Sequence, residues 1–376
     1  MMKTAASCVL GLLAGAVIAA PKDFGKLSDG REAKVWRIVG EGGLVVDVTD
    51  YGGRIVRVYA PDRHGNLDDV ALGWNTAAEY EKYGFSMGTL IGRYGNRIAD
   101  GKFKLDGKTY ELECNETSPA PRHCNLHGGP KGWDSCLWKV RETKFEGAPA
   151  LELVLESPDG DQGFPGKVTM KVVYAVTADN KLVVTYEATT DKPTVLNPTH
   201  HGYWNLAGEA SGNVLSQELE ICADEYSEIT DGLIPVRNAP VKGTVFDFTF
   251  MRRIDALKAR MDADEKLAPT THWYDHNFML RGAVGEMKRA CTMRDGVSGR
   301  EMQVWTTEPA MQMYGAQNMD GTLPAKRAGA MYPQYAGMAL ETQHCPDSPN
   351  HPEFPSTVLR PGETFRSRTE YRFSAR

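Results

Sequence analysis

The stretch KVTMKVVYAVTADNKLVVTYEA, residues 167–188, alternates apolar and polar side chains on either side of a short polar segment. The apolar positions are Val168, Met170, Val172, Tyr174 and Val176 in the first half and Leu182, Val184 and Tyr186 in the second. Because successive side chains of a strand point to opposite faces, this pattern predicts two half-buried strands. The TADNK segment between them has the residue types of a turn, so the stretch predicts an antiparallel β-hairpin.

Similar short runs recur from one end of the chain to the other. They are GLVVDVTDYGG (43–53), GKFKLDGKTYEL (101–112), ALELVLESPDG (150–160), EMQVWTT (301–307) and RSRTEYRFS (366–374). Only residues 75–84 and 251–267 have helical periodicity, and no linker or fixed repeat divides the chain. We therefore expect an all-β antiparallel fold, a sandwich with few short helices, in one domain over residues 21–376.

The first twenty residues, MMKTAASCVLGLLAGAVIAA, have the organisation of a secretory signal peptide. A lysine near the start precedes an apolar run that is too short to span a membrane, and small residues follow it. Gly11 and Gly15 argue against the alternative of a buried N-terminal helix. We expect cleavage before Ala20 or Pro21 and export to the periplasm or the medium.

The charge balance limits the possible partners. The chain has 43 basic and 49 acidic residues and a formal net charge of −6, with no basic cluster. Such a chain repels phosphate backbones, so nucleic acid and anionic membranes are not expected as partners. A small neutral ligand fits this composition better.

Six cysteines remain after removal of the leader, and six allow about 15 pairings. Cys114 and Cys124 bracket a short loop that contains Pro119 and Pro121. An oxidising compartment permits bridges. We therefore expect a disulfide between Cys114 and Cys124.

Three motifs that superficially suggest a metal or a nucleotide each lack a required residue. The calcium-loop spacing in SPDGDQGFPG (157–166) ends on Met170 instead of a glutamate. HWYDH (272–276) has Trp273 where a zinc-protease helix needs Glu, and GRYGNR (92–97) lacks the third glycine of a dinucleotide loop. The sequence therefore predicts no metal and no cofactor.

Histidines in apolar or glycine-rich surroundings suggest a different kind of site. In THHGYWNLAG (199–208), His201 and Tyr203 share one face of a strand and His200 shares the other with Trp204. In NLHGG (125–129), His127 precedes two glycines that allow a close backbone approach. Aromatic rings beside polar groups suit a sugar, which has flat C–H faces and a rim of hydroxyls. The alternatives are that the histidines are hydrogen-bonded core residues and that the aromatic rings only fill the core.

These motifs, together with DGLIPV (231–236), GTVFDF (243–248), YDHNF (274–278) and LETQHCPDSPNHPEFPSTVLRPGETF (340–365), resemble the aldose 1-epimerase family in order and spacing. The resemblance implies a large antiparallel β-supersandwich. It also implies that Glu341 is the catalytic base and His201 the catalytic acid. The implied sugar contacts are Asn96, Arg97, His127, Tyr203, Asp275 and Gln312.

The same resemblance implies interconversion of the α and β anomers of free hexoses such as galactose and glucose, without a cofactor, by a monomer or homodimer. Three features depart from the family pattern: His200 replaces a usual Asn, Cys345 replaces a common aromatic, and CNETSPAPRHC (114–124) enlarges the loop before NLHGG. The alternatives are a non-catalytic sugar-binding protein and a hexose-phosphate 1-epimerase. A retaining glycosidase would need two carboxylates about 5 Å apart.

Overall fold

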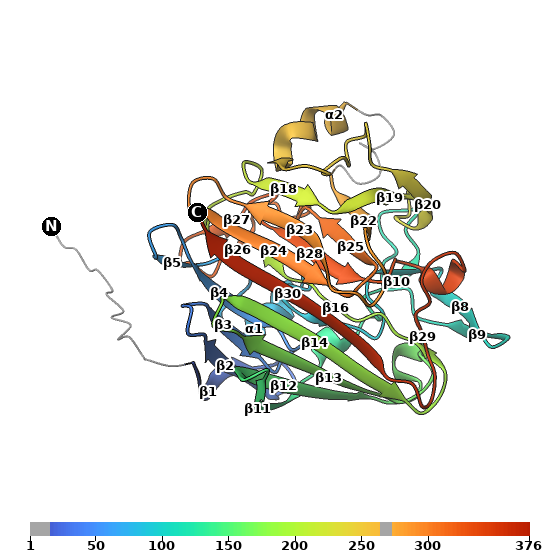
Figure 1. Cartoon of the computed structure of the whole chain (residues 1–376). Coiled ribbons are helices and arrows are strands. Elements are labelled where there is room, and N and C mark those ends of the chain that lie inside the picture. Colours follow the sequence, from blue (N-terminus) through green and yellow to red (C-terminus); the bar gives the residue numbers. More distant parts are fainter. Residues whose placement is uncertain (1–15, 264–272) are drawn as a thin grey trace.

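The computed structural model describes residues 16–263 and 273–376, and its largest element is a nine-stranded antiparallel sheet. Figure 1 shows β30 and β14 running side by side across the front of the molecule. The strand order is β11 (Lys139–Phe145), β12 (Ala148–Ser157), β13 (Val168–Val176), β14 (Lys181–Thr190), β30 (Phe365–Ala375), β24 (Arg300–Thr306), β23 (Lys288–Arg294), β18 (Glu218–Ile221) and β21 (Arg252–Arg253).

Two further sheets complete the main body. The six-stranded sheet has the order β17 (Tyr203–Trp204), β28 (Met338–Gln343), β25 (Ala310–Tyr314), β22 (Asp275–Leu280), β19 (Ala223–Ile229) and β20 (Pro235–Pro240). The five-stranded sheet has the order β1 (Val17–Lys26), β2 (Glu32–Val39), β3 (Val45–Thr49), β4 (Ile55–Pro61) and β5 (Leu67–Asp69).

Five short strand pairs form the loops around these sheets. They are β6 (Leu90–Ile91) with β16 (Thr199–His200), β7 (Arg97–Ala99) with β10 (Cys124–Leu126), β8 (Lys102–Leu105) with β9 (Lys108–Glu111), β15 (Thr194–Val195) with β29 (Val358–Leu359), and β26 (Leu323–Pro324) with β27 (Met331–Tyr332). Every ladder between named strands of the described residues is antiparallel, which confirms the predicted fold class.

The hairpin of residues 167–188 forms as predicted and contributes one wall of the core. β13 and β14 pair from Val168 opposite Thr190 to Val176 opposite Leu182. Their apolar faces belong to one buried cluster with Met311, Met313 and Leu340 of the six-stranded sheet. Alternation of side chains therefore buries one face of each sheet against the other, as a sandwich requires.

The two predicted helical stretches differ in outcome. Residues 75–84 contain α1 (Ala77–Tyr83), whose first turn is capped by the Thr76 hydroxyl. In 251–267 the prediction is wrong at the start, because Arg252 and Arg253 pair with β18 at the sheet edge. Helical structure there is limited to a 3₁₀ turn (Ile254–Leu257) and α2 (Lys258–Asp262), and residues 264–272 lie outside the described part.

The predicted leader reaches into the first strand of the structure. Residues 1–15 lie outside the described part, and β1 begins at Val17. Val17, Ile18 and Ala19 pair with β2 before an irregularity, and pairing resumes at Lys22. Cleavage before Ala20 or Pro21 would therefore remove only the first part of this edge strand. No helix among the described residues has the length and apolarity to cross a membrane.

The predicted disulfide between Cys114 and Cys124 is wrong for this structure, where both thiols are free. An antiparallel bridge pairs Cys124 with Glu116, so Cys114 lies two positions further along the loop. The Sγ of Cys124 contacts Glu116 Oε2 at 3.2 Å, while the Sγ of Cys114 lies 3.7 Å from His123 Nδ1. Backbone register thus directs the two side chains to different partners.

Candidate functional site

A cavity of about 520 Å³ opens over the six-stranded sheet and receives seven of the eight predicted site residues. Its walls come from β17, β22, β25 and β28 of that sheet, from the short pair β7 and β10, and from three loops, at residues 85–86, 116–122 and 317–318. The lining residues are Phe85, Ser86, Asn96, Arg97, Glu116, Ser118, Pro119, Arg122, Leu126, His127, His201, Tyr203, Asp275, Tyr314, Gln317, Asn318 and Glu341. This volume lies within the usual range of small-molecule sites.

The two predicted catalytic residues face each other in this cavity. His201 Nε2 lies 3.4 Å from Glu341 Oε1, although the residues are 140 positions apart in the chain. Strand alternation in β28 points Glu341 into the cavity and its neighbour Thr342 to the other side, where its hydroxyl meets Thr369 at 2.7 Å. His201 follows β16 directly, and its backbone N–H is bonded to the carbonyl of Thr89. Packed strands therefore hold both side chains.

Burial shifts the titration of this pair toward neutral forms. Glu341 is 1% exposed, and its burial, reinforced by the charge of Asp275 and opposed by Arg97, raises its pKa well above the usual value. Burial also lowers the pKa of His201 to about 4. Both shifts favour the neutral forms, so when the pair holds one proton, that proton rests on Glu341 and His201 is neutral.

His127 is oriented by a backbone hydrogen bond that determines its tautomer. The backbone N–H of Asn96 donates to His127 Nδ1 at 3.2 Å. Burial lowers the pKa of His127 well below its usual value, so the ring is neutral and its proton is on Nε2. Both residues have positive φ, 61° at Asn96 and 54° at His127, a strained conformation that is common at functional sites. His127 thus presents an N–H donor to the cavity.

The same tautomer bears on metal binding. The ligand atoms of His127, His201 and Glu341 lie within 4.8 Å of one another, a spacing that a divalent ion could bridge. A metal on His127 Nε2 would require the proton on Nδ1, where it would face the N–H of Asn96. This arrangement fits hydrogen bonding to a hydroxyl better than metal ligation.

Arg97, Asp275 and Gln312 form a polar row beside the pair. Arg97 Nη2 lies 3.6 Å from Asp275 Oδ2, and Gln312 Nε2 donates to Asp275 Oδ1 at 2.7 Å. Gln312 is opposite Glu341 in the β25–β28 register and is the one predicted site residue that does not line the cavity. Its contact with Asp275 places it behind the carboxylate as a positioning group.

Aromatic rings enclose His201, the predicted catalytic acid. The ring of His201 lies 4.9 Å from that of Tyr203 and 6.5 Å from that of Tyr314, between ring centroids. The hydroxyl of Tyr203 donates to the carbonyl oxygen of Phe85 at 3.2 Å, which ties residues 84–88 to the site. These rings supply the flat apolar surface that the C–H face of a sugar requires.

His200 is a core histidine with one hydrogen-bonded ring nitrogen, and its buried Nδ1 has no hydrogen-bond partner among the described residues. Its Nε2 bonds to the carbonyl of Gly88 at 2.9 Å, and its ring packs near Tyr174 and Tyr371 in the core. The glycine after His127 also differs in role from the prediction. A Cβ on Gly128 would lie 2.3 Å from the carbonyl oxygen of Gly92, so the close approach is to backbone and not to a ligand.

Sequence reasoning missed several cavity residues, above all those of the enlarged loop. Glu116, Ser118, Pro119 and Arg122 all line the cavity. The sequence predicts that this loop is an insertion near the site, but nothing local in a proline-rich loop predicts which side chains turn inward. Tyr314 was missed although it lies two residues after Gln312 on the same face of β25.

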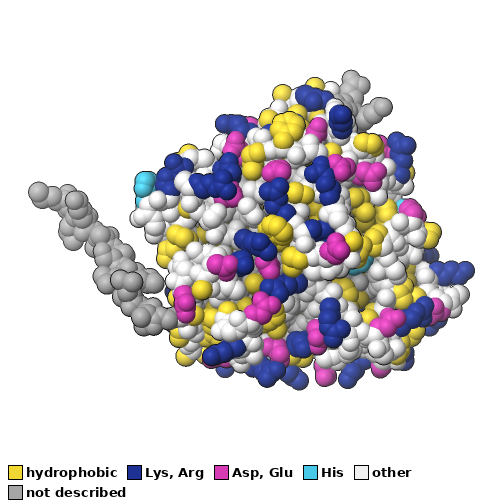
Figure 2. Space-filling model, in the orientation of Figure 1, with side chains coloured by type: hydrophobic (Ala, Val, Ile, Leu, Met, Phe, Trp, Pro, Cys, Tyr) yellow, Lys and Arg dark blue, Asp and Glu magenta, His cyan; other side chains and the backbone are white. Residues whose placement is uncertain are grey.

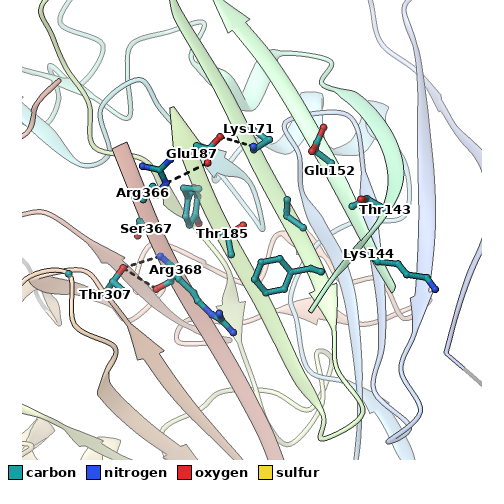
Figure 3. A pocket seen from close by; sticks show the side chains of 14 residues that line it. Thr143, Lys144, Glu152, Lys171, Thr185, Glu187, Thr307, Arg366, Ser367 and Arg368 are labelled. Carbon is teal, nitrogen blue, oxygen red and sulfur yellow. Dashed lines mark hydrogen bonds and ion pairs between the residues drawn. The ribbon is translucent and has the colours of Figure 1, made fainter. Parts of the chain in front are cut away.

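A second groove, of about 460 Å³, lies on the outer face of the nine-stranded sheet (Figure 3). Its charged groups neutralise one another: Lys171 Nζ lies 2.6 Å from Glu187, and Arg366 Nε lies 3.6 Å from the same carboxylate. Arg368 pairs with Glu146 at 2.7 Å. This groove lacks a pair of proton-transfer groups such as His201 and Glu341.

Comparison with known proteins agrees with this geometry. The model of the aldose 1-epimerase family matches residues 34–372. The chain belongs to the aldose 1-epimerase family. It is 38% identical to the galactose mutarotase of Homo sapiens over 333 residues, covering 88% of this chain and 91% of the relative. It is 37% identical to the aldose 1-epimerase of Escherichia coli K12 over 350 residues, covering 92% and 97% of the two chains.

Solved structures show the same fold. An aldose epimerase homologue from C. elegans superposes with a TM-score of 0.80 at 27% identity, covering 95% of this chain and 99% of the other. A galactose 1-epimerase from Lactobacillus acidophilus also reaches a TM-score of 0.80, at 24% identity, covering 96% and 99%. These likenesses establish the galactose mutarotase-like supersandwich for this epimerase.

Proposed function

We propose that this family member interconverts the α and β anomers of free hexoses such as galactose and glucose. The observation that carries the proposal is the 3.4 Å contact between His201 Nε2 and Glu341 Oε1 at a cavity of about 520 Å³. Mutarotation needs one acid and one base at a single hemiacetal, and these two residues fill both roles.

The reaction begins when the one proton of the pair moves from Glu341 to His201, which lie 3.4 Å apart, and gives the carboxylate and the imidazolium. Glu341, as carboxylate, accepts the proton of the C1 hydroxyl while His201, as imidazolium, donates a proton to the ring oxygen. The C1–O5 bond breaks and C1 becomes an aldehyde carbon. Rotation about C1–C2 presents the other face of the carbonyl. The ring oxygen then attacks C1, returning its proton to His201, and the new C1 hydroxyl takes its proton from Glu341.

The remaining polar groups would hold the rest of the sugar during this rotation. His127 offers an Nε2–H donor, Arg97 offers guanidinium N–H groups, and Asp275 offers a carboxylate acceptor. Holding the other hydroxyls leaves C1 as the centre that moves, which lowers the entropic part of the barrier.

Polarimetry of freshly dissolved α-galactose and α-glucose tests the proposal. The purified protein should accelerate the approach to anomeric equilibrium well above the spontaneous rate at the same pH. The non-catalytic alternative predicts binding of the sugar without acceleration. A hexose-phosphate epimerase would favour the 6-phosphates. The two arginines of the cavity are both paired with Glu116, so little positive charge is left to bind a phosphate group.

The acidic net charge supports a small-molecule partner and disfavours nucleic acid. Figure 2 shows acidic and basic side chains interspersed over the face that carries β30 and β14, without a single-sign patch. We also propose export directed by residues 1–20, followed by function as a monomer or homodimer without a metal.

A further inference from the structure

The enlarged loop reaches the sugar site through one carboxylate. Glu116, 11% exposed at its side chain, accepts from Arg97 twice, from Nε to Oε2 at 2.5 Å and from Nη2 to Oε1 at 3.0 Å. Arg122 Nη1 donates to Oε1 at 3.2 Å, and the Cys124 thiol contacts Oε2 at 3.2 Å. All three donors therefore converge on a single side chain.

This contact decides how Arg97 faces the cavity. A guanidinium is planar, so a two-point contact with a carboxylate fixes both its position and its plane. With Nε and Nη2 engaged by Glu116, the opposite edge is left with weaker contacts, at 3.5 Å to Asn96 Oδ1. Asp275, at 3.6 Å, is a more distant counter-charge than Glu116. The loop thus supplies the principal partner of a predicted sugar-binding cation.

The electrostatics agree with this geometry. Burial alone would raise the pKa of Glu116, but the hydrogen bond and charge of Arg97, with smaller contributions from Cys124 and Arg122, outweigh burial and lower it. Likewise, burial disfavours the charge of Arg97, and Asp275 and Glu116 more than compensate and raise its pKa. Each charge depends on the other, because a buried ion without its partner is strongly disfavoured.

We propose that Glu116 is a positioning residue for sugar binding: it holds Arg97 in the plane and place from which Arg97 binds the hydroxyls, and the enlarged loop thereby sets substrate affinity through this one carboxylate. This inference rests on the proposed mutarotase function. Glu116 touches no reacting atom in this scheme and acts through Arg97. Because Arg97 binds hydroxyls that do not react, its contribution is the same in the ground state and the transition state, so losing its orientation raises KM with little change in kcat.

The variant Glu116→Gln keeps the size of the side chain and removes the charge that organises Arg97. We expect KM for galactose to rise about 10-fold or more, since hydrogen bonds to charged groups are the stronger class, and kcat to stay within about threefold. Glu113→Gln is the matched control, because Glu113 is an exposed glutamate of the same loop without a side-chain contact among the described hydrogen bonds and ion pairs. It should leave both constants unchanged.

A second background separates positioning from a general structural effect. If Glu116 acts through Arg97, then Glu116→Gln introduced into Arg97→Lys should change KM by less than about twofold, because the orientation is already lost. An equal rise in KM in both backgrounds, or a fall in kcat at unchanged KM, would overturn the proposal. Thermal unfolding of each variant identifies any loss of folded protein, and the constants are then normalised to the folded fraction.

Failure of the mutarotase function itself would look different. In that case the wild-type protein and Glu113→Gln would both lack acceleration. Galactose affinity, measured by calorimetric titration, would still report whether Glu116→Gln weakens binding. Unchanged affinity in Glu116→Gln would reject the positioning role, whatever reaction the wild-type protein catalyses.

Discussion

Replacing Glu341 with glutamine removes the base while keeping the shape of the site. The amide cannot accept the C1 proton, and positioned general acid–base groups contribute about 10²–10⁴ in rate. Because Glu341 is 1% exposed, water has little access to take over its role, so we expect a loss near the upper end of that range. At about 1.36 kcal/mol per tenfold, a loss near 10⁴ corresponds to roughly 5 kcal/mol in the barrier.

The assay is polarimetry of α-galactose with the spontaneous rate subtracted, together with calorimetric titration of the sugar. Binding should survive in Glu341→Gln, because Arg97, Asp275 and His127 remain. Glu308→Gln is the control: Glu308 is also buried, but it pairs with His344 at 2.7 Å and does not line the cavity. Its rate per folded molecule should match the wild type. Near-normal mutarotation by folded Glu341→Gln would refute the assignment and turn attention to Asp275.

Three further outcomes are expected. The pH profile of kcat/KM should fall on the acid side near pH 4, where a second proton binds to the pair of His201 and Glu341. It should fall on the alkaline side at the raised pKa of Glu341, where the pair loses its last proton. An acid limb centred above about pH 6 would contradict the argument that burial lowers the pKa of His201. Exhaustive EDTA treatment should leave activity intact, since the tautomer of His127 opposes ligation; loss restored only by a divalent ion would show that a metal takes part. N-terminal sequencing of the exported protein should begin at Ala20 or Pro21, and active protein that retains Met1 would argue against a leader.

The sequence by itself determined the fold class and predicted which two residues form the catalytic pair. Period-two alternation, as in residues 167–188, is a local property that each strand expresses on its own, so the antiparallel sandwich could be predicted before any tertiary contact was known. The motifs around His201 and Glu341 carry their identity in short contiguous stretches. The helix prediction for 251–267 was wrong at its start because Arg252 and Arg253 pair with β18 at the edge of the sheet.

Only the tertiary structure decided how these groups meet. The 3.4 Å approach of His201 and Glu341 depends on β28 packing beside the segment that follows β16, and no local pattern specifies that distance. The tautomer of His127 depends on a backbone N–H from Asn96, and the role of Glu116 depends on the bridge that sets it opposite Cys124. The same register gives Cys114 and Cys124 different side-chain partners. Burial, register and the orientation of hydrogen bonds are properties of the folded chain, because they arise from contacts between residues that are distant in sequence.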